Sequence, residues 1–121
     1  MTHNDFSHIE LATDDPKKAQ KFYGGLFGWS FEDIPPLGTC LPYTMIQPGA
    51  GPTGGILSKP QPEIPTAWMP YVQVEQMESD LEKTKALGGE VLMPVTEFPG
   101  GRFAVIKDPT GGVIGLLDIK S

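Results

Sequence analysis

The chain repeats its own residue pattern at an offset of 61 positions, about half its length of 121 residues. When residues 47–57 are laid over residues 108–118 without a gap, three pairs are identical: Pro48 with Pro109, Gly51 with Gly112, and Gly54 with Gly115. At the same offset Leu26 meets Leu87 and Gly28 meets Gly89, so the match extends beyond one turn. Half a chain of this length buries too little surface to be stable alone, so the two halves are expected to share one core.

The first half has the pattern of a strand, a helix and three further strands. Side chains alternate from Phe6 to Thr13 as in a strand, and Asp15 followed by Pro16 is a typical helix start. Apolar residues then recur at helical spacing up to Gly28, whose lack of a side chain suits a helix end. The remaining strands are expected at residues 29–34, 43–47 and 53–58, with turns at 35–38 and 48–52.

The second half repeats this order after a proline-rich connector at residues 59–66, which is expected to be semi-rigid. A strand is predicted at 69–75, followed by a helix from Met77 that ends at Gly88 and Gly89. Three more strands are predicted at 90–95, 102–107 and 113–119. The predicted fold is therefore α+β. One domain (1–121) is built from two tandem βαβββ modules, at about 6–58 and 67–121, whose curved mixed sheet surrounds a central cavity with the helices outside.

Composition narrows the class of protein. With 39% hydrophobic and 20% charged residues, the chain is typical of a globular protein, and no apolar run approaches the ~20 residues of a membrane helix. The N-terminus lacks the pattern of a secretory signal, and the single cysteine, Cys40, cannot form an intrachain disulfide, so a cytoplasmic location is expected. A net charge of −6 without a basic cluster argues against binding to nucleic acid.

Three motifs bring the chain close to a known family. His8-Ile-Glu-Leu11 lies on the first predicted strand, Phe22-Tyr23 in the first helix, and Asp108-Pro-Thr-Gly111 before the last strand. Together with the paired modules, they resemble the vicinal oxygen chelate superfamily, which includes glyoxalase I, extradiol dioxygenases, and the bleomycin- and fosfomycin-resistance proteins. Residues 27–31 and 101–105 are similar to a bacterial glyoxalase-like subgroup. The resemblance covers almost the whole chain and implies a homodimer.

The resemblance also implies where a metal would be held. Enzymes of the superfamily place one ligand, usually His or Glu, on the first strand and one on the last strand of each module. Carried over by motif, those positions are His8, Gly54, Met69 and Gly115. Glycine offers no donor, a thioether is too soft for the usual metals, and a catalytic site needs about three protein ligands. No cofactor is therefore expected.

Two alternatives keep chemistry at His8. Glu10 follows on the same strand face, about 6.6 Å along the strand, and Gln73 could add an amide oxygen, so that the three would rebuild a divalent metal site. Without a metal, His8 assisted by Glu10 could act as a general base. Otherwise His8 is a hydrogen-bonding residue of a core or pocket.

Further ligand-binding residues are predicted around the missing metal ligands. They are Met45, Gly54, Met69, Tyr71, Arg102 and Gly115. The glycines would let a ligand approach the backbone, and the methionines and the tyrosine would supply an adaptable apolar wall. The arginine could reach a carboxylate or phosphate on the ligand. The alternatives are core packing for the apolar residues and a solvated charge for the arginine.

The sequence thus leaves three functions open. The leading hypothesis is a metal-independent protein that binds a small molecule, for sequestration or as an accessory to metabolism. The second is a lyase, isomerase or dioxygenase that uses a rebuilt metal site at His8 and Glu10, or His8 alone. The third is a dimerising structural module whose cavity is filled by its own side chains.

Overall fold

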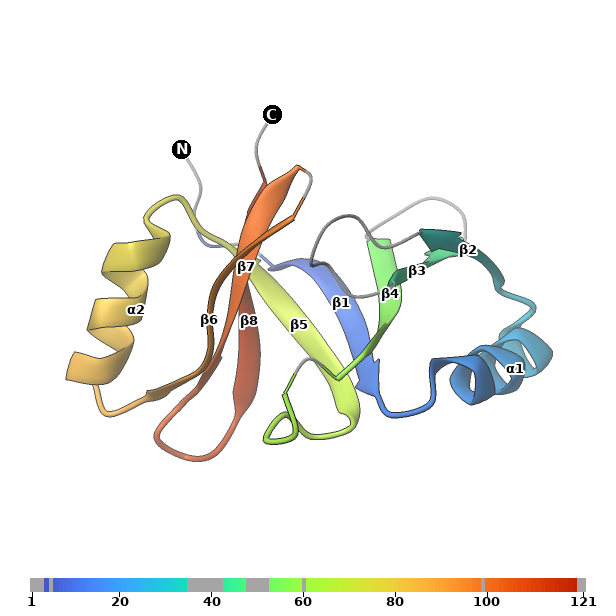
Figure 1. Cartoon of the computed structure of the whole chain (residues 1–121), viewed down its shortest axis with the longest axis horizontal. Coiled ribbons are helices and arrows are strands. Elements are labelled where there is room, and N and C mark those ends of the chain that lie inside the picture. Colours follow the sequence, from blue (N-terminus) through green and yellow to red (C-terminus); the bar gives the residue numbers. More distant parts are fainter. Residues whose placement is uncertain are drawn as a thin grey trace. The chain divides into compact units, whose positions relative to one another are not determined.

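The computed structural model describes residues 4, 6–34, 43–47, 53–59, 61–98 and 100–119 (Figure 1). The chain divides into two compact units: an N-terminal unit of residues His8–Trp68, and a C-terminal unit that combines Met69–Ser121 with Met1–Ser7. The predicted turns at 35–38 and 48–52 and the single cysteine, Cys40, lie outside the described residues.

The N-terminal unit has the order of a βαβββ module. Its elements are β1 (Phe6–Thr13), α1 (Pro16–Phe27), β2 (Ser30–Ile34), β3 (Tyr43–Gln47) and β4 (Thr53–Ser58). The strands lie in the order β2-β3-β4-β1. β1 runs parallel to β4, and β3 is antiparallel to both of its neighbours. The first and last strands of the module are therefore adjacent in space.

The predicted boundaries of α1 are confirmed by its caps. The Asp15 carboxylate accepts a hydrogen bond from the Lys18 backbone N–H at 3.1 Å, and Pro16 occupies the first turn. At the other end Gly28 has a φ of 73°, a left-handed conformation that glycine adopts without strain. The buried Thr44 hydroxyl accepts a hydrogen bond from Gln20 on α1 and donates one to Asp33 on β2. These bonds tie the helix to the sheet.

The core of the N-terminal unit lies between α1 and the sheet. Leu11, Ile46 and Ile56 form its buried centre. Partly buried residues pack around them: Ala19, Tyr23, Trp29, Phe31 and Trp68. Because side chains alternate along a strand, Leu11 faces α1, whereas His8 and Glu10 face away from it.

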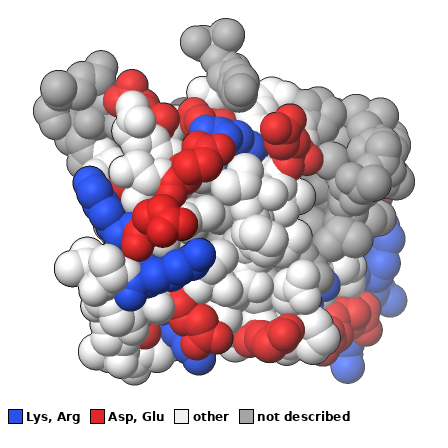
Figure 2. Space-filling view, turned by 60° about the vertical axis from the view of Figure 1, so that its left-hand side comes forward, with Lys and Arg blue, Asp and Glu red and all other residues white. Residues whose placement is uncertain are grey.

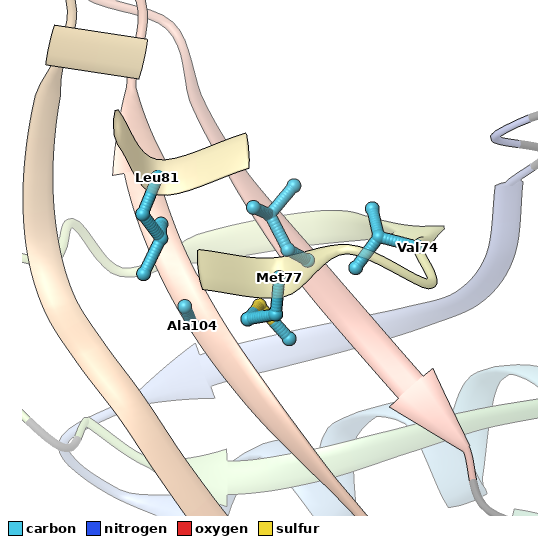
Figure 3. Close-up of a cluster of buried hydrophobic side chains, with 5 residues drawn as sticks. Val74, Met77, Leu81 and Ala104 are labelled. Atoms are coloured by element: carbon cyan, nitrogen blue, oxygen red, sulfur yellow. The ribbon is translucent and has the colours of Figure 1, made fainter. Parts of the chain in front are cut away.

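The C-terminal unit repeats the same order. Its elements are β5 (Ala67–Gln73), α2 (Met77–Ala86), β6 (Glu90–Phe98), β7 (Gly101–Lys107) and β8 (Val113–Ile119). The strands lie in the order β5-β8-β7-β6, with β5 parallel to β8. Met77 and Leu81 extend from α2 toward Ala104 on β7, close to Val74 (Figure 3), and Leu116 completes this buried cluster.

The predicted fold class, α+β with two βαβββ modules, is confirmed. Two strands differ from their predicted extents by two residues or more. β5 spans Ala67–Gln73 instead of 69–75, and β6 continues to Phe98, past Pro94. The pairing of β6 with β7 shifts register between Val91 and Met93 and again between Met93 and Thr96. Such irregularities let an edge strand accommodate a proline, which cannot donate to the ladder.

Strand pairing corrects the gapless repeat. Glu10 pairs with Gly55 between β1 and β4, and Tyr71 pairs with Gly115 between β5 and β8. Glu10 and Tyr71 are 61 positions apart, but Gly55 and Gly115 are only 60 apart. The structural counterpart of Gly115 is therefore Gly55 rather than Gly54. A shift of one residue matters because it moves a side chain to the opposite face of the sheet.

The face that carries α2 has acidic and basic side chains interspersed (Figure 2). Among its described residues this unit has four ion pairs: Arg102 with Glu78 and with Asp118, Lys85 with Glu82, and Lys107 with Glu90. Such pairs are typical of a solvated surface. In the part of the chain that the structure describes, no helix is both long and apolar enough to cross a bilayer.

The turn between β7 and β8 is organised by one carboxylate. Asp108 Oδ1 accepts hydrogen bonds from the backbone N–H groups of Thr110 at 2.7 Å and Gly112 at 3.1 Å, and from the Thr110 hydroxyl at 2.6 Å. These bonds, with the Thr110 hydroxyl contributing most, hold the pKa of Asp108 below its usual value. The motif that carried the resemblance is thus a turn-forming device.

We expect Asp108 to contribute a pH-dependent stabilisation. A lowered pKa in the folded state stabilises the protein above the ordinary aspartate pKa of ~3.9, and this contribution is lost as pH falls through the lower folded value. Asp108→Asn should therefore lower the midpoint of urea unfolding at pH 7 and reduce its dependence on pH between about 5 and 2. An unchanged pH dependence would contradict this role, and the exposed carboxylate variant Glu82→Gln is the control.

Candidate functional site

A cluster of polar side chains lies on the face of the N-terminal sheet that points away from α1. His8 Nε2 is 2.6 Å from the Tyr43 hydroxyl and 3.5 Å from Glu10 Oε1. His8 and Glu10 come from β1, whereas Tyr43 begins β3 on the far side of β4. The cluster, named here the His8 cluster, therefore brings together side chains from β1 and β3, which lie on either side of β4.

A glycine on the central strand allows this arrangement. Gly55 on β4 pairs with Glu10 on one side and with Met45 on the other. A Cβ atom at position 55 would overlap the phenol of Tyr43. The Tyr43 side chain therefore lies across Gly55 and fills the space that a side chain at this position would take. In this way Tyr43 reaches His8 on the other side of β4.

Burial governs the protonation of Tyr43. Glu10 is only 6% exposed, and the side chain of His8 is 16% exposed. Burial raises the pKa of the Tyr43 phenol far above its usual value, and the Glu10 carboxylate raises it further through its charge and a hydrogen bond. Tyr43 therefore keeps its proton at neutral pH. The cluster presents a hydroxyl donor, an imidazole and a buried carboxylate within hydrogen-bonding range of one another.

The predicted site residues of the first module lie on two different faces of its sheet. His8, Glu10 and Met45 share the face of the His8 cluster. Gly54 does not: a Cβ there would meet the Ile9 carbonyl at 3.1 Å and the Ile46 side chain at 3.6 Å, on the α1 side of the sheet. The one-residue slip of the repeat places Gly55, and not Gly54, on the face of the His8 cluster. Ligand binding at Gly54 stays a prediction.

Gly115 lies against a side chain of the protein itself. A Cβ at this position would overlap the ring of Tyr71, its partner on β5. Gly115 therefore makes room for a tyrosine of the protein, and its role beside a ligand stays a prediction. Tyr71 and Met69 are both buried, and the Tyr71 ring contacts Phe103 edge-on at 6.4 Å between centroids.

Arg102 is engaged within the C-terminal unit. Its guanidinium donates two hydrogen bonds to the Glu78 carboxylate on α2 and one, at 3.3 Å, to Asp118 on β8. Arg102 lies on the α2 side of the sheet because it alternates with Phe103 and shares its face with the core residue Ala104. These bonds hold α2 against the sheet. Ligand binding by Arg102 stays a prediction.

Comparison with known proteins identifies the family. The chain belongs to the Glyoxalase/Bleomycin resistance protein/Dioxygenase superfamily, whose sequence model matches residues 5–116. The fold is also found in methylmalonyl-CoA epimerase from Mycobacterium tuberculosis, with a TM-score of 0.64, 13% identity, and coverage of 96% of this chain and 88% of that one.

Two relatives are similar in sequence. CFP32 of Mycobacterium tuberculosis (strain CDC 1551 / Oshkosh) is 35% identical over 112 residues, which cover 89% of this chain and 43% of CFP32. A glyoxylase-like domain-containing protein of Didymella fabae is 34% identical over 101 residues, which cover 78% of this chain and 77% of that protein. The chain thus spans less than half the length of CFP32.

The metal ligands of the family do not fit the residues present. The first-strand positions are His8 and Met69, and the last-strand positions on the same faces are Gly55 and Gly115. Three of these four offer no nitrogen or oxygen side-chain donor. Within the described ranges no three His, Cys, Asp or Glu residues form a group that could hold a metal ion. Gln73, considered for a rebuilt site, lies at the end of β5 beside Leu117. The absence of a cofactor stays a prediction.

Sequence reasoning missed Tyr43 and Gly55. The alternation along residues 43–47 puts Tyr43 on the same face as Met45, which was predicted, so a signal for Tyr43 was present. Gly55 could not be distinguished from Gly54 without the pairing of β4 with β1, because adjacent glycines give no side-chain pattern.

We expect Gly55→Ala to displace Tyr43. The added methyl group should lower the free energy of unfolding by about 1–3 kcal/mol through overpacking. Gly25→Ala is the matched control: a Cβ at position 25 meets nothing within 4 Å, so the same substitution should be neutral or stabilising by up to ~1 kcal/mol. Chemical denaturation of both variants tests this, and equal effects would contradict the packing of Tyr43 over Gly55.

Alkaline titration tests the environment of Tyr43. At about pH 11, above the ordinary tyrosine pKa of ~10, folded wild type and Tyr43→Phe should show equal tyrosinate absorbance, whereas the denatured proteins should differ by one of three tyrosines. Because the raised pKa favours the folded state only while the phenol is protonated, wild-type stability should fall more steeply than that of Tyr43→Phe above about pH 10. Early ionisation of Tyr43 would contradict its burial beside Glu10.

Proposed function

We propose that this protein binds a small molecule without a metal, and that the polar group of the ligand meets the His8 cluster. The observation that carries the proposal is the 2.6 Å contact between His8 and Tyr43 beside the buried carboxylate of Glu10. Sequestration of the ligand, or an accessory role in metabolism, would follow from such binding. A cytoplasmic location and a homodimer belong to this proposal and rest on the sequence and the family.

The cost of burial supports a functional role for the cluster. Taking a carboxylate out of water costs several kcal/mol, which partners repay only in part, and apolar replacements of buried polar groups often stabilise a protein. The neighbouring positions on this face, Met45 and Leu57, show that apolar residues fit there. A buried His, Glu and Tyr together are therefore better explained by a ligand than by stability.

The chemistry of the cluster favours a ligand that both accepts and donates hydrogen bonds. Tyr43 keeps its proton and is a donor, and Glu10, when ionised, is only an acceptor. His8 serves either role according to its tautomer. The Met45 thioether beside them is flexible and polarizable, which suits an apolar part of the same ligand.

Proton transfer on the bound molecule is the second candidate function. The short His8–Tyr43 contact favours it, because an acid and a base within hydrogen-bonding reach are the requirement for general acid–base catalysis. His8 or Glu10 would take a proton, and Tyr43 would donate one.

The filled structural module remains the third candidate. The packing of the Tyr43 and Tyr71 rings over Gly55 and Gly115 favours it, because these rings fill space that a ligand was predicted to occupy.

A thermal-shift screen of polar metabolites and antibiotics, run after treatment with a chelator, tests the proposal. A true ligand should stabilise the wild type by ~2.7 kcal/mol at a hundredfold excess over its dissociation constant. The shift should vanish in His8→Ala and Tyr43→Phe. It should persist in Tyr23→Phe, which removes a hydroxyl that accepts a hydrogen bond from Trp68 on the opposite face.

Three outcomes distinguish the alternatives. Stoichiometric Zn, Ni, Mn or Fe in the purified protein that is lost in His8→Ala would contradict metal independence. Deuterium transfer from solvent into the ligand, abolished in Glu10→Gln, would establish the second candidate. The absence of a stabilising compound from a broad screen would favour the structural module.

A further inference from the structure

The Glu10 carboxylate places a negative charge in the His8 cluster. Glu10 is 6% exposed, and the Tyr43 phenol beside it keeps its proton and is neutral. His8 Nε2 lies 2.6 Å from the Tyr43 hydroxyl but 3.5 Å from Glu10 Oε1. A charge-assisted bond from an imidazolium to a carboxylate is typically about 2.7–2.9 Å long. The geometry is therefore that of a His8–Tyr43 hydrogen bond beside a carboxylate, rather than of a close His8–Glu10 ion pair.

The lysines of the N-terminal unit are placed elsewhere. This unit has four lysines and no arginine. Lys17 pairs with Asp33 at 3.0 Å, and Lys59 pairs with Asp14 at 3.6 Å. The other two are exposed residues of α1, which covers the opposite face of the sheet: Lys18 and Lys21. These lysines therefore serve other carboxylates or the other face.

A ligand of opposite charge suits a carboxylate buried in this way. Removing a carboxylate from water is costly unless opposite charge and hydrogen bonds offset the loss of hydration. A cationic group on the ligand supplies both. A carboxylate or phosphate on the ligand would instead be repelled by Glu10 at close range. The cluster therefore discriminates against anionic ligands.

A primary ammonium matches the acceptors of the cluster. It carries three N–H donors and no acceptor. The Glu10 carboxylate accepts hydrogen bonds on its oxygens, and the Tyr43 oxygen can accept while its own proton is donated. Met45 is partly buried and shares this face with Leu57, so an apolar group attached to the nitrogen would meet apolar side chains.

We propose that the ligand of the His8 cluster is an organic primary amine, whose ammonium group binds the Glu10 carboxylate and the Tyr43 oxygen and whose apolar part lies on Met45. This inference rests on the proposed function, because it names the chemical class of the ligand bound at that site. It narrows the polar group of the ligand to a cation that donates hydrogen bonds.

Nitrogen–proton NMR titration of the full chain, after treatment with a chelator, tests the inference. Benzylamine, benzyl alcohol and benzoate share an aromatic ring and differ in charge, and benzyltrimethylammonium has the charge of the amine without its N–H donors. We expect benzylamine to bind about tenfold or more tightly than the alcohol and the quaternary cation, and benzoate to bind weakest. The backbone amide signals of His8, Glu10 and Met45 should shift on binding.

Glu10→Gln removes the charge with little change of shape. It should weaken the binding of benzylamine about tenfold and leave that of benzyl alcohol unchanged. The matched control is Glu82→Gln, which makes the same change at a side chain of 79% exposure on α2 and should keep the preference for the amine. Met45→Ala retains the carboxylate, so it should weaken both probes alike. This variant tests the site even if Glu10→Gln does not fold, which circular dichroism reports.

The outcomes separate this inference from the proposed function. Benzyl alcohol or benzoate that binds as tightly as benzylamine, with the binding lost in His8→Ala, would overturn the amine and leave the proposed function standing. A preference for the amine that survives Glu10→Gln would also overturn the inference. Failure of benzylamine to bind overturns it as well, whereas the proposed function falls only if the wider thermal-shift screen also finds no ligand.

Discussion

The register of β1 against β4 is the constraint on which the N-terminal unit depends. It pairs Glu10 with Gly55 and Leu11 with Ile56, so that one set of side chains meets α1 and the alternate set faces away. His8 and Glu10 share a face because they lie two positions apart on β1. The register places Gly55 of β4 beside Glu10 on that face. Tyr43 joins them because Gly55, at the facing position, has no side chain.

The two modules share a backbone plan but differ in the chemistry of their sheets. In each, the facing residue of the last strand is glycine, and a tyrosine ring lies across it: Tyr43 over Gly55, and Tyr71 over Gly115. The first tyrosine meets a histidine and a buried carboxylate, whereas the second meets Phe103. A polar site is therefore built in one module only, among the residues that the structure describes.

The two helices are stabilised in different ways. α2 has a favourable charge order, buries two apolar side chains and is bound by the Glu78–Arg102 ion pair. α1 packs its partly buried Ala19 and Tyr23 against the sheet, and it is held by its Asp15 cap and by hydrogen bonds from Gln20 and Lys17.

The sequence by itself determined the order of elements, the caps of α1 and the duplication, because local periodicity and cap residues act over a few positions. It also placed His8, Glu10 and Met45 on their strands. The tertiary structure alone decided that Gly55 replaces Gly54, that Tyr71 fills the space at Gly115, and that Arg102 binds Glu78 and Asp118. These outcomes depend on strand register and on packing between distant segments. A one-residue change in the spacing of the repeat moves a side chain to the opposite face of the sheet.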